Sequence, residues 1–218
     1  MKKFTNILNE KMEIEKGTIK MSILFTDIID SAIKWKDNKD DMMIALEEQS
    51  IRFDKLTKKH KGEIIKSIGD AYMVTFKNIE NSIQFAIELQ NDLKDNPIKV
   101  KNKNIEIRIG ICYGEVHEST IELQGYKMVD YMGNVVNSAA RIEGKVCKPG
   151  NIVFSSFDDN TNIKDLLKDY KVDMIRFKNE GDEAKRSSRL LTDVQRYYYK
   201  DIKELKGIKE IDVYQINL

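Results

Sequence analysis

The sequence predicts an α+β fold, with a ferredoxin-like βαββαβ core and a C-terminal α/β elaboration. Apolar runs and alternating segments, which are typical of strands, are interleaved with segments of helical periodicity. Their order is strand, helix, strand, strand, helix, strand, and further elements follow. The length of 218 residues suits one domain of good size, so we expect residues 1–218 to form a single domain.

The first elements are a helix, a strand and a long helix. Apolar residues at helical spacing predict a short N-terminal helix over residues 1–16, within an N-terminal segment of residues 1–18. The continuous apolar run of residues 19–27 predicts a central strand. Apolar residues near one face predict a helix over residues 31–60, and we expect Gly62 to end it as a C-cap glycine.

A hairpin, a helix and an alternating strand complete the predicted core. Residues 63–76 predict two short strands joined by a tight turn at Gly69. Residues 79–94 have the clearest amphipathic helical pattern in the chain. Residues 104–112 alternate between isoleucine and other residues, which indicates a half-buried strand, and residues 114–130 suggest a hairpin or a long arm.

The elaboration begins with a helix predicted over residues 134–145 and a strand over residues 151–155. Residues 205–218 are consistent with two short strands or one bent strand. The highly charged segment of residues 156–202 has no recognisable pattern, and we treat it as an unexplained insertion.

Charge and hydropathy exclude several classes of protein. The chain has 37 Lys and Arg against 36 Asp and Glu, a formal net charge of +1, which gives no bulk electrostatic reason to bind nucleic acid or anionic membranes. It lacks an apolar run of ~20 residues and the apolar segment of a signal peptide. We therefore expect a cytoplasmic protein without a nucleic-acid or membrane partner.

Cysteine and histidine are scarce in this sequence, whereas carboxylates are abundant. Two cysteines and two histidines cannot build a four-ligand Cys/His zinc site of the usual spacing. We expect Cys112 and Cys147 to be reduced, small apolar residues. A metal in this protein would therefore be held by carboxylates, which favour hard cations such as Mg²⁺ or Mn²⁺.

Two aspartates occupy positions that the predicted topology brings together. Asp27 ends the first strand, and Asp70 lies in the hairpin between the next two strands. The first and third strands of a βαββαβ sheet are central neighbours, so the two carboxylates would lie side by side and could hold a divalent cation. The alternative is structural, with Asp27 capping the following helix and Asp70 serving as a turn residue.

Four stretches together resemble the class III nucleotidyl cyclase catalytic domain, the adenylate and guanylate cyclase family. They are ILFTDIIDSAIKW at 23–35, GEIIKSIGDAYMVTF at 62–76, IRIGICYGEV at 107–116 and DYMGNVVNSAARIEG at 130–144, and LKGIKEIDVYQI at 205–216 resembles the family's closing strand. The resemblance implies the class III cyclase fold. It also implies conversion of a nucleoside triphosphate to its 3′,5′-cyclic monophosphate and pyrophosphate.

The resemblance also implies a role for each matching residue. Two divalent cations, Mg²⁺ or Mn²⁺, would be held by Asp27, Asp70 and the backbone carbonyl of Ile28. Substrate would be bound by Lys66 and Asp130 at the base and by Lys206 at the terminal phosphates. Catalysis would use Asn137 to orient the ribose and Arg141 to stabilise charge in the transition state.

The base-reading pair favours ATP as the substrate. Lys66 is a donor and Asp130 an acceptor, which complements the ring-nitrogen acceptor and exocyclic amine donor of adenine. Guanine reverses this pattern, and guanylate enzymes of the family tend to carry Glu and a small polar residue or Cys instead. In this family each site is shared between subunits, so the resemblance implies a homodimer with two equivalent active sites.

Two alternatives remain open from the sequence. No sensor module is recognisable in the chain, as in stand-alone pyrimidine cyclases that make cyclic UMP or cyclic CMP in antiviral signalling, although the Lys66 and Asp130 pair argues against that function. The chain could also be a catalytically dead cyclase-like regulatory module, although it retains both metal aspartates. Asp30 stands where the family commonly has glycine and adds a negative charge near the expected triphosphate.

Overall fold

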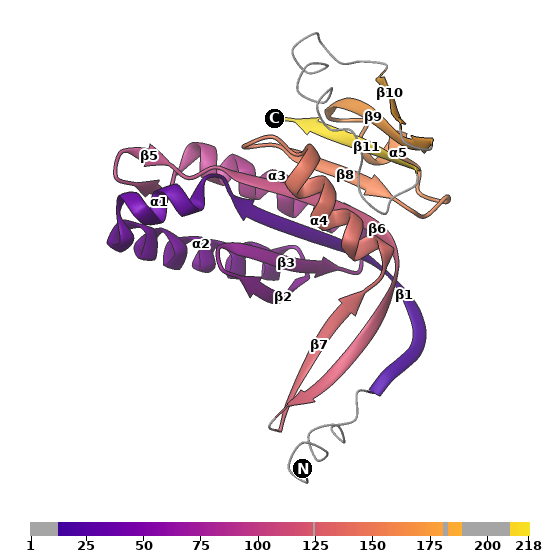
Figure 1. The fold of residues 1–218 in the computed structure, drawn as a ribbon, viewed down its shortest axis with the longest axis horizontal. Helices are drawn as coiled ribbons and strands as arrows, with labels where there is room; N and C mark the ends of the chain where they lie inside the picture. Colours follow the sequence, from indigo (N-terminus) through magenta and orange to yellow (C-terminus); the bar gives the residue numbers. More distant parts are fainter. Residues whose placement is uncertain (1–12, 124, 181–182, 189–209) are drawn as a thin grey trace.

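The fold was obtained as a computed structural model, which describes residues 13–123, 125–180, 183–188 and 210–218 (Figure 1). The described part contains a nine-stranded sheet and a separate two-stranded sheet formed by β4 (Lys99–Val100) and β5 (Lys103–Asn104). The large sheet consists of β1 (Glu13–Ile28), β2 (Gly62–Ile68), β3 (Ala71–Phe76), β6 (Ile107–Leu123), β7 (Tyr126–Met132), β8 (Ile152–Ser156), β9 (Lys171–Glu180), β10 (Glu183–Ser188) and β11 (Glu210–Asn217). The helices are α1 (Ser31–Asp37), α2 (Lys39–Lys59), α3 (Ile79–Asp95), α4 (Asn134–Val146) and α5 (Ile163–Leu166).

The strand order confirms the predicted ferredoxin-like core. The sheet runs β10-β9-β11-β8-β6-β1-β3-β2, and β7 pairs with β6 outside this path. Strand β1 lies between β6 and β3 and is antiparallel to both. The elaboration extends the sheet from β8, which is parallel to β6 and antiparallel to β11. Together β6 and β7 form a long arm that leaves the body of the domain (Figure 1).

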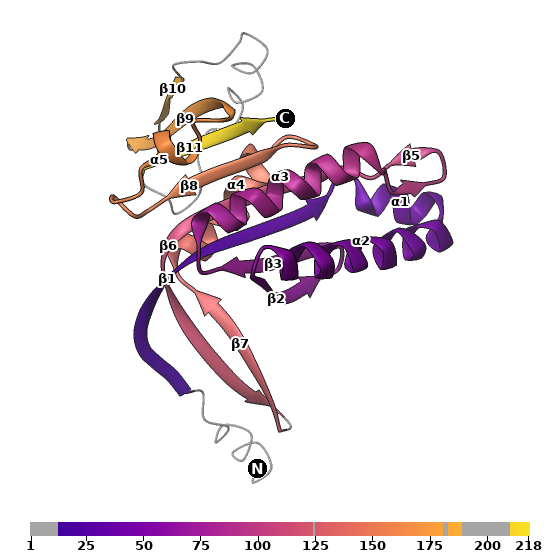
Figure 2. The ribbon, with the colours of Figure 1, turned by 180° about the vertical axis from the view of Figure 1, so that it is seen from behind.

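Helices cover both faces of the sheet. On one face, Leu24 of β1 packs in a cluster with Phe53 of α2 and Phe85 of α3. On the other face, Ile23 of β1 packs in a cluster with Ile142 of α4. Figures 1 and 2 show α4 on one side and α2 and α3 on the other. Because successive side chains of a strand alternate between faces, the neighbouring residues Ile23 and Leu24 pack in different layers.

Gly110 allows α4 to approach the sheet closely. A Cβ atom at this position would lie 2.5 Å from Cβ of Glu143 and 2.6 Å from its backbone nitrogen, closer than real Cβ contacts. The backbone of α4 therefore packs almost directly on β6. This contact places Glu143 over the sheet, where its side chain is 11% exposed.

The helix expected over residues 31–60 is two helices, and Gly62 is not its C-cap. The break lies at Asn38, whose extended backbone ends α1 and whose side chain accepts a hydrogen bond from Asp41 N to cap α2. His60 caps the C-terminus of α2, and Lys61 takes the left-handed conformation with φ 57°. Gly62 is instead the first residue of β2. A glycine is needed there because a Cβ would lie 2.3 Å from the Phe76 ring.

The structure differs from the sequence prediction in the N-terminal segment and in residues 156–202. Residues 13–16, expected in the N-terminal helix, belong to β1, and residues 1–12 lie outside the described residues. Within the segment that we left unexplained, α5, β9 and β10 form, and β9 pairs with β11. The hairpin turn at Gly69, with φ 66°, and the elements expected near residues 79–94, 134–145 and 151–155 are confirmed.

None of the helices in the described ranges is both long enough and apolar enough to cross a membrane. Cys112 and Cys147 are buried and free, as expected. Burial raises the pKa of the Cys147 thiol to about 12, so this group stays protonated and apolar at neutral pH.

Candidate active site

The structure places Asp27 and Asp70 at the same end of neighbouring strands. Asp27 is the penultimate residue of β1, and the β1–β3 register pairs Thr26 with Tyr72. Continuing this antiparallel register by two residues sets Asp70, in the β2–β3 turn, beside Ile28. The Ile28 side chain is 1% exposed within the core, which fixes the end of β1. The predicted placement of Asp27 and Asp70 at one end of adjacent central strands is thus confirmed.

Asp70 has an unsatisfied carboxylate oxygen. Its Oδ2 is buried and has no hydrogen-bond partner among the described residues. Its backbone oxygen accepts a 3.4 Å hydrogen bond from Nε2 of Gln49, which ties the turn to α2. A buried, unpaired carboxylate oxygen is costly unless a cation or donor meets it, so this side chain fits a role as ligand of a hard divalent cation. Across the described ranges, no group of three or more His, Cys, Asp or Glu side chains is arranged to hold a metal.

Asp27 has a cationic partner on the adjacent strand. The register pairs Asp27 with Arg108 of β6, and Nη2 of Arg108 lies 2.5 Å from Oδ2 of Asp27. On its other side, Nε of Arg108 lies 3.0 Å from Oε1 of Glu143 on α4. This second contact lacks the alignment of a hydrogen bond, and both atoms are buried without any other hydrogen-bond partner in the described structure.

Burial and the neighbouring charges both shift the pKa values of this cluster. The pKa of Glu143 is raised to about 7, mainly because burial desolvates the carboxyl, while the charge of Arg108 acts to lower it and the charge of Asp27 acts to raise it. Burial acts to lower the pKa of Arg108, but the carboxylates of Glu143 and Asp27 outweigh it and raise the pKa overall. The guanidinium therefore stays charged between two acidic side chains.

Lys66 and Asp130 form an ion pair, with Nζ and Oδ2 2.6 Å apart. Lys66 lies on β2 at a register shift, where Ile64 opposes Val74 and Lys66 opposes Met73, so Ile65 is an extra residue. Directly opposed residues share a face, so this bulge turns Lys66 to the face of the sheet on which Met73 packs with α4. The side chains are 39% and 32% exposed, so both remain accessible to a ligand.

Among the described residues, neither the Asn137 nor the Arg141 side chain makes a hydrogen bond or an ion pair with these pairs. Asn137 is exposed and Arg141 half-buried on α4, outside the helix face that packs on the sheet. Glu143, two residues from Arg141, is buried and lies against Arg108. Lys206 lies outside the described residues.

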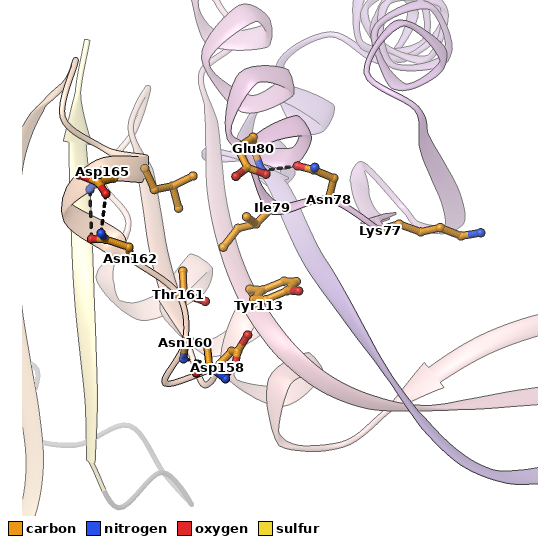
Figure 3. A pocket seen from close by; sticks show the side chains of 11 residues that line it. Lys77, Asn78, Ile79, Glu80, Tyr113, Asp158, Asn160, Thr161, Asn162 and Asp165 are labelled. Carbon is orange, nitrogen blue, oxygen red and sulfur yellow. Dashed lines mark hydrogen bonds between the residues drawn. The ribbon is translucent and has the colours of Figure 1, made fainter.

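Two cavities of the described part of the chain lie away from these residues. One, of about 520 Å³, is drawn in Figure 3 and lies between the start of α3 and the loop that precedes α5. Another, of about 670 Å³, has Tyr131 and Glu118 in its wall. None of the predicted site residues that the structure describes lines either cavity.

Two residues of the site escaped the sequence reasoning. The alternation of residues 104–112 marks Arg108 as one of the residues between the isoleucines, but it does not reveal a partner. The β1–β6 register supplies that partner, since it sets Arg108 opposite Asp27. Glu143 is recognisable as buried once Gly110 is known to admit the backbone of α4.

Comparison with known proteins identifies the family. The sequence model described as the adenylate and guanylate cyclase catalytic domain matches residues 14–184. This chain belongs to that cyclase family. Among curated relatives, an adenylate cyclase of Neurospora crassa is 27% identical over 94% of this chain. The human guanylate cyclase soluble subunit beta-2 is 29% identical over 65% of the chain.

Solved cyclase domains share the fold. The guanylate cyclase domain of RhGC from Catenaria anguillulae, in complex with GTP, superposes with a TM-score of 0.66 at 20% identity, covering 91% of this chain and 96% of that one. The adenylyl cyclase CyaB from P. aeruginosa gives 0.65 at 19% identity, covering 93% and 95%. The match with this chain spans 10% of the length of the Neurospora relative and 24% of the length of the human one. Both adenylate and guanylate cyclases are among these matches, so the preferred base has to be argued from the site.

Proposed function

We propose that this chain acts as one catalytic domain that converts ATP to 3′,5′-cyclic AMP and pyrophosphate, in a homodimer that uses two divalent cations, Mg²⁺ or Mn²⁺. The observation that carries the choice of ATP is the ion pair between Lys66 and Asp130, 2.6 Å apart. It supplies one donor from β2 and one acceptor from β7 side by side.

This pair is complementary to the edge of adenine. The Lys66 ammonium would donate to the ring nitrogen, and the Asp130 carboxylate would accept from the exocyclic amine. Asp130 Oδ1 already accepts a 2.8 Å hydrogen bond from Tyr131 N, which orients the carboxylate before a base arrives. Guanine presents a ring N–H and a carbonyl oxygen at the same edge. It would leave both side chains facing groups of the wrong kind, and unpaired polar groups in a site are what make such discrimination strong.

The acidic end of β1 and β3 would hold the cations. Asp27, Asp70 and the backbone carbonyl of Ile28 provide oxygen ligands, and the unpaired Oδ2 of Asp70 supports this assignment. When bound, the cations would favour ionisation of the 3′-hydroxyl and neutralise the charge of the triphosphate. His60 is 2.7 Å from Glu88, away from the predicted site, so it is not the base that the reaction would otherwise need.

The other residues would orient the substrate and stabilise charge. The 3′-oxygen forms a bond to the α-phosphorus, the bond from this phosphorus to the leaving pyrophosphate breaks, and the hydroxyl proton passes to solvent. Asn137 would fix the ribose so that attack is in line, and Arg141 would stabilise the negative charge on the α-phosphate. Lys206 would hold the terminal phosphates.

A homodimer would bring these groups together. Asn137 and Arg141 lie on α4 outside its packed face, whereas Asp27 faces Arg108 and Glu143. The arm also exposes apolar side chains, with Tyr126 75% and Met128 48% exposed, as a surface that a second subunit covers would. In a head-to-tail dimer, Asn137 and Arg141 of one subunit would serve the aspartates of the other.

The proposal is tested by turnover with single nucleotides. Purified protein is incubated separately with ATP, GTP, CTP and UTP and Mn²⁺ or Mg²⁺, and each product is identified by mass. We expect cyclic AMP from ATP with the highest kcat/KM. A preference for UTP or CTP would establish a pyrimidine cyclase, and no product from a protein shown to be dimeric would establish a catalytically dead module.

A further inference from the structure

Arg108 lies between two carboxylates from different elements. Its Nη2 is 2.5 Å from Asp27 on β1, and its Nε is 3.0 Å from Glu143 on α4. A third contact, from Nη1 to the backbone oxygen of Gly144, is 3.5 Å long. The side chain is 23% exposed, so the guanidinium is enclosed by the sheet and α4.

We propose that Arg108 is a positioning residue that competes with the divalent cation for Asp27, and that Glu143 is the partner that keeps Arg108 when the cation takes Asp27. The inference rests on the proposed function in one respect, the role of Asp27 as a metal ligand. Arg108 then sets how tightly the nucleotide-free protein binds a divalent cation.

The contacts of Arg108 with Asp27 and Glu143 differ in hydrogen-bond geometry, and this difference allows Arg108 to change its partner. The bond to Asp27 is a charge-assisted hydrogen bond. The contact with Glu143 is at ion-pair distance but unaligned, and it leaves Arg108 Nε and Glu143 Oε1 buried without a hydrogen bond. A small rotation that turns the guanidinium from Asp27 toward Glu143 would satisfy both atoms, since burial makes an unpaired polar atom costly.

Glu143 cannot follow Arg108 toward Asp27 by moving its helix. The Gly110 contact sets the backbone of α4 on β6, with room for no additional atom. Arg108 is the longer and more adaptable side chain of the pair, so it is the group that changes partner. A release of Asp27 therefore costs little, because the guanidinium keeps the buried Glu143 carboxyl as a partner.

A charge argument gives the sign of the effect. A guanidinium in contact with Asp27 repels an approaching divalent cation and occupies one oxygen of the carboxylate. Removing the positive charge of Arg108 should therefore tighten cation binding to the free protein. Replacing the Glu143 carboxyl by an amide should weaken it, because Arg108 then has a poorer second partner than Asp27 and stays on Asp27.

The experiment measures Mn²⁺ affinity without nucleotide, by electron paramagnetic resonance of the free ion. Arg108→Gln should bind Mn²⁺ about tenfold more tightly than wild type, and Glu143→Gln several-fold more weakly. Arg108→Lys, which keeps the charge, should stay within about threefold of wild type. Lys20→Gln removes a cation that pairs with Asp158 at 3.1 Å and serves as the matched control. The affinity of this control should not change.

Each outcome decides the inference. An Arg108→Gln protein that binds Mn²⁺ no more tightly than wild type would overturn it, because loss of a merely structural residue weakens a site or leaves it unchanged. If Arg108→Gln does not fold, as judged by circular dichroism, a Glu143→Gln protein with unchanged or tighter binding overturns it instead. Adding Asp27→Asn to Arg108→Gln should abolish the gain, and a gain that persists also overturns the inference. Cyclic AMP formation by the wild type is measured separately. A protein that makes no cyclic AMP can still show the predicted changes in Mn²⁺ affinity, and a protein that makes cyclic AMP can lack them.

Discussion

Lys66 of β2 and Asp130 of β7 form a 2.6 Å ion pair across two strands that are not neighbours in the sheet. A β-bulge at Ile65 turns Lys66 to this face, and the arm brings Asp130 to it. The pair therefore depends on a bulge in one strand and on a hairpin arm from another part of the chain, and this supports a role in ligand recognition over a role in sheet stability.

Exchange of this pair should change base selectivity. The double variant Lys66→Glu with Asp130→Cys replaces the donor by an acceptor. The site then no longer complements the edge of adenine and instead complements the edge of guanine. We expect the kcat/KM for ATP to fall by about a hundredfold, and the ratio of GTP to ATP turnover to rise by more than that. Steady-state kinetics with both nucleotides measures the two values.

A second ion pair of the same kind serves as the control for this exchange. Lys20 and Asp158 are 3.1 Å apart, and Lys20→Glu should leave the ratio of GTP to ATP turnover unchanged. Equal loss of activity with all nucleotides in the double variant would show that the pair does not read the base.

Loss of either aspartate that we propose as a metal ligand should abolish turnover and preserve the fold. Asp27→Asn and Asp70→Asn keep the shape of each side chain and remove the charge that a divalent cation needs, so we expect kcat to fall by about a thousandfold. The exposed Asp37 at the end of α1 provides a matched control, and Asp37→Asn should keep full activity. The melting temperature of each variant shows whether it is folded, and a well-folded aspartate variant with activity near wild type would contradict the metal assignment.

Shared active sites predict complementation between two inactive proteins. A dimer of one Asp27→Asn chain and one Arg141→Ala chain has one site with neither defect and one site with both. Random mixing makes half of the dimers mixed, so about a quarter of the wild-type activity should return.

Two defects in the same half-site provide the control for complementation. Mixing Asp27→Asn with Asp70→Asn leaves a defective aspartate in every site, so activity should not return. A mixture of Asp27→Asn and Arg141→Ala that is no more active than its separate components would show that the sites are not shared in this way.

Glu143 should make stability depend on pH. Its pKa rises from 4.5 to about 7 on folding, so the native protein keeps a proton that the unfolded chain has lost in this window. The free energy of unfolding should therefore fall as pH rises, by about 3 kcal/mol in total, with the loss complete above pH ~7. The charged groups that face it are Arg108 from β6 and Asp27 from β1, and the thiol of Cys147, the C-cap residue of α4, lies near it.

Glu143→Gln removes this group from the titration. Urea unfolding at about pH 5 and about pH 8 should show the variant gaining stability relative to wild type as pH rises. Parallel pH profiles for the two proteins would refute the buried, proton-retaining state of Glu143.

Local sequence patterns sufficed for most of the fold. Alternation and apolar runs located the strands around Asp27 and Gly69, and the amphipathic pattern located α3. The break at Asn38 was missed because α1 and α2 are separated by one residue, so their apolar patterns join without interruption. The function of Gly62 was misread because a glycine after a helix is most often a cap, whereas this one admits the ring of Phe76 from β3.

The site was predictable to the extent that it follows from topology. Adjacent central strands were sufficient to bring Asp27 near Asp70, and the paired motifs were sufficient to nominate Lys66 and Asp130. Arg108 could not be placed in the same way, because its partner depends on the register between β1 and β6, which periodicity does not specify.

The central claim is that Lys66 and Asp130 select adenine, and a competition measurement tests it most directly. Wild-type protein is given an equimolar mixture of ATP, GTP, CTP and UTP with Mn²⁺, and the cyclic products are quantified by mass spectrometry. We predict that cyclic AMP exceeds each other cyclic nucleotide by about a hundredfold. Cyclic GMP, cyclic UMP or cyclic CMP as the main product would contradict the claim.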